Sequence, residues 1–153
     1  MIKINIITSN KDWKKIFKNP KNYLKKKILH LNKTAFFKRK NLEFSILLTG
    51  SKEIKEFNKK FRKKNKITDV LSFPFQEKKL LKKILKKKHN LYLGDIAVNF
   101  DRVISKDIKL NFKKSFDRLW VHGLVHLLGG RHSNNKEYIK MKKIENKFFK
   151  AVN

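Results

Sequence analysis

The sequence contains no cysteine, only two prolines and only five glycines in 153 residues. The absence of cysteine excludes disulfide scaffolds, cysteine-ligated zinc, iron–sulfur clusters and thiol catalysis. Any metal site must therefore use histidine, carboxylate or backbone-oxygen ligands. Long apolar runs are also missing, since none approaches the ~18 residues that a membrane-spanning helix needs. We therefore expect a protein without membrane spans, located in the cytoplasm.

Acidic residues are scarce: 12 Asp and Glu stand against 41 Lys and Arg, for a formal net charge of +29. A field of this size attracts polyanions, and phosphate neutralisation supplies most of the sequence-independent affinity of nucleic-acid-binding proteins. A second explanation stays open, because Lys, Asn, Ile and Phe have A/T-rich codons and are enriched by drift in base composition alone. The few arginines are the more informative cations, because the guanidinium fork matches two phosphate oxygens.

Hydrophobic periodicity predicts four strands and several helices in one domain that spans residues 1–153. The strands are expected at residues 2–8, 42–48, 70–74 and 91–100, the last broken by Gly94. Helices are expected at residues 20–38, 51–64, 111–128 and 134–150, with Pro20 at a helix start and Ser51 as an N-cap. The Lys-rich stretch 78–89 is interpreted as a solvated segment in preference to an amphipathic helix. This order of elements predicts an α+β fold, with a small mixed four-stranded sheet packed against about five helices.

Three of the five histidines lie in one short segment, at positions 122, 126 and 132. His122 and His126 are four residues apart, so on a helix they share one face. Gly129 and Gly130 end that helix, because glycine takes the left-handed conformation that a C-cap needs, and the chain can then bring His132 back towards the other two imidazoles. Three such ligands leave one tetrahedral position for water, as in catalytic zinc sites.

The sequence therefore predicts one zinc ion per chain, held by His122, His126 and His132 in a cleft beside a helix that carries the His-Gly-x-x-His pattern. Gly123 supports a tightly packed site, because a glycine inside a helix costs ~1 kcal/mol relative to alanine and needs a compensating reason. His30 and His89 have no such neighbours and are interpreted as surface residues.

The same spacing matches the histidines of metzincin proteases, so a metallopeptidase is an alternative. Those enzymes place a glutamate directly after the first histidine as the general base. Here that position is Gly123, which cannot transfer a proton. The peptidase is therefore the less favoured interpretation.

The segment from His122 to His132 resembles the signature His-Gly-x-Leu-His-Leu-x-Gly-Tyr-Asp-His of the YbeY endoribonucleases, also called rRNA maturation factors. Two further stretches agree with that family: the run from Phe61 to Phe75, and Leu93-Gly94-Asp95-Ile96. The resemblance covers about residues 42–150 in the right order. It implies an α+β domain with one zinc on three histidines, which cleaves single-stranded RNA.

The family's biological task would be 3′-end maturation of small-subunit (16S) ribosomal RNA and ribosome quality control, with ribosomal RNA and the small subunit as partners. Arg62 matches the family's functional arginine, so Arg62 and His122 are the expected catalytic residues. Arg62 would neutralise the scissile phosphate as charge builds up there. Lys59, Lys63 and Lys64 are expected to guide the RNA backbone.

No general base is identifiable, and Asp69 and Asp95 are interpreted as structural residues at turns near the cleft. Arg131 stands where the family has aspartate, and since arginine cannot accept a hydrogen bond, we expect it to point away from the metal. A second class of function stays open: a metal-stabilised RNA-binding assembly factor with little catalysis. Neither the oligomeric state nor the cleavage position follows from the sequence.

Overall fold

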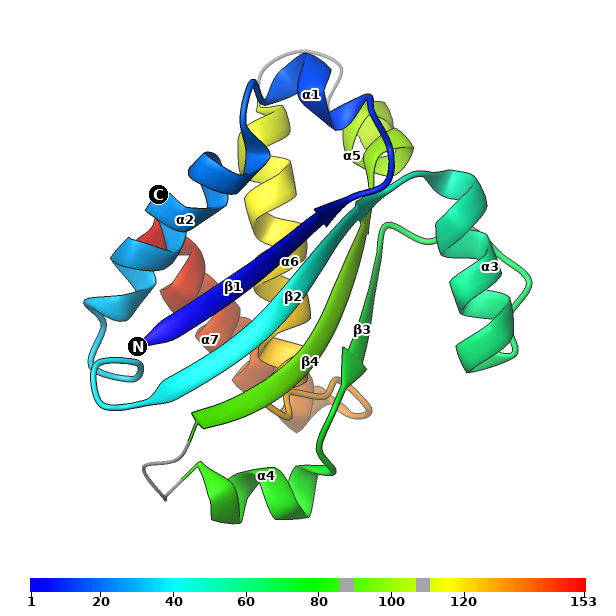
Figure 1. Cartoon of the computed structure of the whole chain (residues 1–153). Coiled ribbons are helices and arrows are strands. Elements are labelled where there is room, and N and C mark those ends of the chain that lie inside the picture. The colour runs from blue at the N-terminus through cyan, green and yellow to red at the C-terminus, as the bar shows by residue number, and fades with distance from the viewer. Residues whose placement is uncertain (86–89, 107–110) are drawn as a thin grey trace.

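A computed structural model describes residues 1–85, 90–106 and 111–153, and it has the mixed α+β architecture that the sequence predicts (Figure 1). The sheet has four strands in the order β1-β2-β4-β3. β1 (Ile2–Thr8), β2 (Asn41–Thr49) and β4 (Asn90–Asn99) are parallel, whereas β3 (Val70–Pro74) runs antiparallel to β4 at one edge. These bounds agree with the predicted strands to within two residues.

The described residues form seven helices, where the sequence predicts about five: α1 (Trp13–Ile16), α2 (Pro20–Asn32), α3 (Ser51–Arg62), α4 (Lys78–Ile84), α5 (Phe100–Lys106), α6 (Phe112–Leu127) and α7 (Asn135–Val152). Helices α2, α6 and α7 pack together on one face of the sheet, and α3 covers part of the other (Figure 1). The short α1 and α5 escaped prediction because four to seven residues carry too little periodicity to identify a helix. Among the described residues, no helix is both long and apolar enough to cross a bilayer.

Most of the core lies between the sheet and α6, which explains why α6 is the most apolar helix. Trp120 and Leu124 on α6 are fully buried, as are Ile96 and Val98 on β4. A buried polar network ties α6 to α2: the fully buried carboxylate of Asp117 accepts hydrogen bonds from Tyr23 (3.0 Å) and Trp120 (2.9 Å), and pairs with Lys27 at 2.9 Å. Helix α6 is thereby fixed on two sides.

Gly94 forms a bulge in β4, where the sequence suggests a break. The register against β2 shifts by one residue between Glu43 and Ser45, and Gly94 has φ +130°. A Cβ atom there would lie 2.1 Å from the carbonyl oxygen of Phe73, so only glycine fits. The extra residue turns Leu93 and Ile96 towards the same core, and the strand continues to Asn99.

Two predicted helix ends are wrong. The predicted helix 20–38 ends at Asn32, because the chain turns there and the Thr34 hydroxyl donates a hydrogen bond to the carbonyl oxygen of Leu31 at 2.7 Å. Ser51 is not an N-cap; Gly50 occupies that position, and the backbone N–H of Ser51 donates to Asp101 at 2.9 Å. A carboxylate from α5 therefore does the capping that the sequence assigns to serine.

The interpretation of 78–89 as a solvated segment is also wrong where the structure describes it. Residues 78–84 form α4, and Leu81 is only 2% exposed in the main core. Lys78 pairs with Glu137 of α7 at 3.3 Å. Burial of Leu81 outweighs the solvation of the lysines around it. The rest of the stretch, residues 86–89, including His89, lies outside the described residues, whereas His30 is exposed as predicted.

Candidate metal centre

Helix α6 carries the centre, and Gly123 brings that helix close to the sheet. A Cβ atom on Gly123 would lie 2.7 Å from Cγ2 of Ile96 on β4 and 3.1 Å from Oγ of Ser72 on β3. The missing side chain therefore permits the close approach of α6 to both strands, which gives the reason for a mid-helix glycine. His122 and His126 lie on α6 directly before and three residues after Gly123. The close contact at Gly123 therefore also positions these two histidines relative to β3 and β4.

The structure brings His122, His126 and His132 together, with one possible ligand atom from each within 4.8 Å of the others. The Nε2 atoms of His122 and His126 are 3.0 Å apart. His132 reaches them from the segment after α6, because the chain leaves the helix at Leu128 and Gly129 adopts φ +87°. The predicted left-handed glycine stop is thus present at Gly129.

The outer nitrogens of two imidazoles have protein acceptors. Nδ1 of His122 lies 2.6 Å from Oε1 of Glu145 on α7, and Nδ1 of His126 lies 2.9 Å from the carbonyl oxygen of Gly130. A hydrogen bond from Nδ1–H leaves Nε2 unprotonated and directed to the shared point, and such acceptors orient the histidines of metal sites. Glu145 is not among the residues predicted from the sequence; the available signal is its position on the buried face of the C-terminal helix.

Electrostatics favour the neutral form of the central imidazole. Burial and, after it, the charge interaction with the neighbouring His122 lower the pKa of His126 to about 4, against the hydrogen bond to Gly130, which raises it. Burial raises the pKa of Glu145, but its hydrogen bond and charge interaction with His122, and then those with Lys142, outweigh burial and lower the pKa overall. At neutral pH the Glu145 carboxylate is therefore ionised where it lies against Nδ1 of His122.

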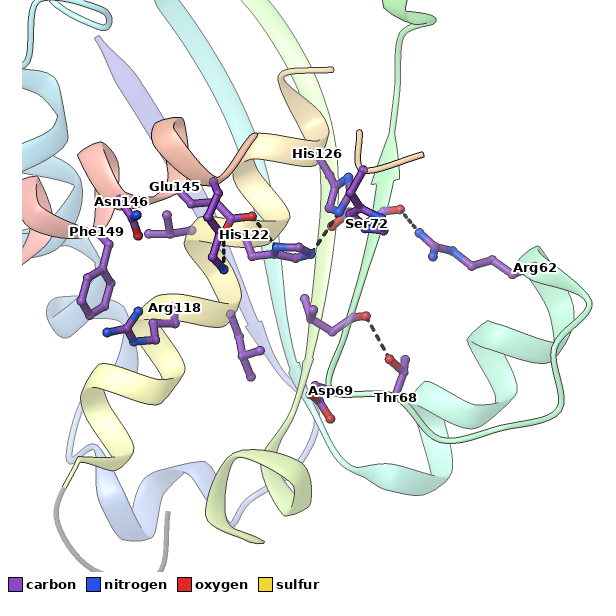
Figure 2. Close-up of a pocket in the computed structure, with 15 residues that line it drawn as sticks. Arg62, Thr68, Asp69, Ser72, Arg118, His122, His126, Glu145, Asn146 and Phe149 are labelled. Atoms are coloured by element: carbon purple, nitrogen blue, oxygen red, sulfur yellow. Dashed lines mark hydrogen bonds and ion pairs between the residues drawn. The ribbon is translucent and has the colours of Figure 1, made fainter. Parts of the chain in front are cut away.

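The three histidines line a cleft of about 550 Å³. Figure 2 shows His122 and His126 in the middle of this cleft, Arg62 on the α3 side, and Arg118 with Phe149 on the other side. The Arg62 side chain is exposed and donates to the carbonyl oxygen of Ser72 at 2.9 Å. Arg62 thus projects into the cleft beside the histidines, where the sequence resemblance places it.

Other sequence-predicted residues lie further out. Lys59, Lys63 and Lys64 are exposed around the end of α3 and do not line this cleft. Asp69 lines it, whereas Asp95 lies on β4 and accepts a hydrogen bond from Tyr92 at 2.6 Å. This contact is compatible with the structural role expected of Asp95, but the predicted location at a turn near the cleft is wrong, because Asp95 lies within β4 and does not line the cleft.

Arg131 is exposed and lines a smaller cleft of about 190 Å³ that adjoins the main one and shares Arg62, Ser72 and His126 with it. Glu77 and Lys78 line the same smaller cleft, so this cleft contains one carboxylate besides the Arg131 guanidinium. That the Arg131 side chain points away from the metal stays a prediction.

The donor set fits a divalent metal such as zinc. Two nitrogens bound to a tetrahedral zinc at ~2.0–2.1 Å lie ~3.3 Å apart, close to the 3.0 Å between the Nε2 atoms of His122 and His126. Three imidazoles suit zinc and other borderline metals and disfavour magnesium or calcium, which prefer oxygen. The site is also open, since His132 is exposed and the cleft reaches solvent.

An α+β fold with three histidines converging beside an arginine-bearing cleft indicates a protein with a candidate metal site. Comparisons with known proteins narrow that description. The family described as "Endoribonuclease YbeY" matches residues 6–153. A protein of that name from Pelagibacter ubique is 39% identical over 154 residues, covering 99% of this chain and 97% of the relative. Another, from Buchnera aphidicola subsp. Schizaphis graminum, is 34% identical and covers 97% of this chain and 89% of the relative.

The chain belongs to the YbeY endoribonuclease family. The solution structure of TM1509 from Thermotoga maritima shares the fold, with a TM-score of 0.56 over 98% of this chain and 89% of that protein, at 23% sequence identity. The family predicted from the signature histidines is therefore confirmed.

Proposed function

We propose that this protein is a zinc-dependent endoribonuclease that hydrolyses phosphodiester bonds in single-stranded RNA, with one zinc per chain on His122, His126 and His132. The observation that carries the proposal is the convergence of these imidazoles in a cleft that also holds Arg62. Membership of a family named for endoribonuclease activity supports RNA as substrate. The net charge of +29 supports a polyanionic one.

The bound metal supplies Lewis-acid polarisation of a phosphoryl oxygen and a lowered pKa for coordinated water. The chain's own residues hold and orient the reactants. Glu145 fixes the ring of His122 through Nδ1, and the Gly130 carbonyl does the same for His126. Arg62 is the second cation of the cleft: its guanidinium, now on the Ser72 carbonyl, exchanges that neutral acceptor for the scissile phosphate, which binds it more strongly because the acceptor is charged.

The finer assignment is 3′-end maturation of 16S ribosomal RNA and ribosome quality control in the cytoplasm, with the small ribosomal subunit as partner. It is supported by the resemblance to rRNA maturation factors and by the basic surface. Lys59, Lys63 and Lys64 extend the positive charge from Arg62 along the exposed end of α3. We assign to these lysines the guidance of the RNA backbone, an electrostatic role that does not require contact with the metal.

The decisive experiment combines metal analysis and RNA cleavage on one purified sample. Wild-type protein should contain about one zinc per chain and cleave single-stranded RNA, whereas His122→Ala should lose both. Arg62→Ala should lose cleavage and keep its metal, because Arg62 contacts substrate and not the ion. His30→Ala, at an exposed histidine remote from the cleft, is the matched control and should change neither.

The alternative, an RNA-binding assembly factor with little catalysis, gives a different pattern in the same experiment. Metal and RNA affinity would be present, and cleavage would be absent or unchanged by His122→Ala. Equal metal content in the wild type and in all three histidine-to-alanine variants would refute the metal site itself.

A further inference from the structure

The cleft contains a cation–aromatic pair that lies outside the histidine cluster. Arg118 is on α6, four residues before His122 and thus about 6 Å along the helix axis. Its guanidinium carbon lies 4.2 Å from the centre of the Phe149 ring on α7. Both residues line the same cleft as the histidines, at the end away from Arg62 (Figure 2). Substrate held at the metal therefore has this pair beside it.

The arrangement leaves a flat cationic surface facing the cleft. Arg118 is exposed and Phe149 is half-buried, so the ring supports one face of the guanidinium while the other remains accessible. Bases of single-stranded RNA stack on aromatic rings and on guanidinium planes in this way. Asn146, one turn before Phe149, also lines the cleft, and its amide offers both a donor and an acceptor to a base edge.

We propose that Arg118, supported by Phe149, is a stacking platform for the base of a nucleotide next to the scissile phosphate. The proposal rests on the proposed function, since it takes RNA as the ligand of the cleft. Its consequence is selectivity: a base in a duplex is already stacked and paired, whereas an unpaired base can lie on the guanidinium at no such cost. The platform thus gives a physical reason for a single-strand requirement.

Charge at Arg118 alone does not explain the arrangement. A cation that only attracts phosphate would not need an aromatic ring beneath it. The 4.2 Å contact holds the guanidinium against the ring and restricts its orientation, which matters for a flat ligand. A purely structural role, joining α6 to α7, is the competing explanation, and it predicts loss of stability without any change in how the substrate's bases are sensed.

The test is an abasic scan. Short single-stranded RNA substrates, each with one base removed at a successive position, are compared by kcat/KM with zinc-loaded wild type, Arg118→Lys and Phe149→Leu. Arg118→Lys keeps the charge and removes the plane, so phosphate attraction is preserved. Arg39→Lys, at an exposed arginine that lines none of the clefts described here, is the matched control. Thermal unfolding of each variant separates stability from recognition.

Wild type should lose about tenfold in kcat/KM when one particular base is removed, the size expected for one stacked base. Both cleft variants should reduce that penalty to about twofold or less, and Arg39→Lys should leave it intact. A full penalty retained in Arg118→Lys and Phe149→Leu, or no base-sensitive position in wild type, would overturn the platform.

Failure of the proposed function would look different. Wild type would then cleave none of the RNAs, and the same abasic series, made as single-stranded DNA and followed by fluorescence anisotropy, would still report stacking. A binding penalty that disappears in Arg118→Lys would support the platform, and a penalty that persists would refute it.

Discussion

The contact between Gly123 and Ile96 makes a prediction whose sign can be tested. Gly123→Ala should not stabilise the protein, although alanine is the better helix former by ~1 kcal/mol. The new Cβ would lie 2.7 Å from Cγ2 and 3.1 Å from Cδ1 of the fully buried Ile96. Overpacking of this kind costs ~1–3 kcal/mol, so the net effect is a loss of ~0–2 kcal/mol.

The partner position separates the two contributions. In an Ile96→Ala background both overlapping side-chain atoms of residue 96 are gone and only the 3.1 Å approach to the Ser72 hydroxyl remains, so Gly123→Ala should become stabilising by up to ~1 kcal/mol if that hydroxyl rotates away. In an Ile96→Val background only Cδ1 is lost and the 2.7 Å overlap with the branch methyl remains, so the substitution should stay unfavourable. Because Ile96→Ala itself costs ~2–5 kcal/mol, only the difference between each pair of proteins is interpreted.

The assay is urea unfolding of metal-free protein, followed by the fluorescence of the buried Trp13 and Trp120, with each variant measured in all three backgrounds. If Gly123→Ala stabilises the wild-type background by the full ~1 kcal/mol of helix propensity, then the close contact between α6 and Ile96 does not exist in solution. The same change in sign in the Ile96→Val and Ile96→Ala backgrounds would also contradict the atom-level assignment.

Three further predictions concern Glu145 beside the histidines, Tyr23 in the buried network of Asp117, and the excess positive charge. Glu145→Gln keeps an acceptor for Nδ1 of His122 but removes the charge, and should lower zinc affinity by ~10-fold or more in a chelator competition; Glu137→Gln, on the same helix but paired with Lys78, should not. Burial and the charge of Asp117 raise the pKa of Tyr23 well above 10, so absorbance at 295 nm should show no ionisation of Tyr23 in folded protein at pH 11, when compared with Tyr23→Phe. Since the folded-state pKa is the higher one, the stability that Tyr23 contributes is present below pH ~10 and declines above it. RNA affinity should fall steeply with salt on a log–log plot, and a nearly flat response would mean that the excess charge reflects base composition alone.

The sequence was sufficient for the parts of the fold that local pattern controls. Alternation located all four strands, and the spacing of the histidines on a helix that ends in glycine was enough to assemble the metal centre. These features depend on residues close together in the chain. The left-handed Gly129 belongs to the same category. Gly123 stands out in the sequence as a glycine inside a helix, but the residues that require it, Ile96 and Ser72, are distant in the chain and were not predicted.

What escaped prediction depends on contacts between distant segments. Glu145 is 23 residues from His122, and its place on the buried face of α7 does not reveal which distant side chain it contacts. The Asp101 carboxylate reaches the start of α3 across 50 residues. Likewise, α4 is helical because Leu81 enters the core, a fact that a lysine-rich composition conceals. In each case a contact with a distant segment determines the structure, and the periodicity of a single sequence does not reveal such contacts.

The position of β3 at the edge of the sheet has a consequence for how Arg62 variants behave. An edge strand exposes backbone groups that can pair with another chain and begin aggregation. In this protein a charged side chain occupies the carbonyl of Ser72, and the strand is only five residues long and ends in Pro74, which has no N–H to offer. Arg62 therefore occupies a backbone acceptor on the free edge that a strand of another chain would otherwise bind. Removing it uncovers that edge, so the solution state of Arg62→Ala needs light scattering before any lost cleavage is attributed to chemistry.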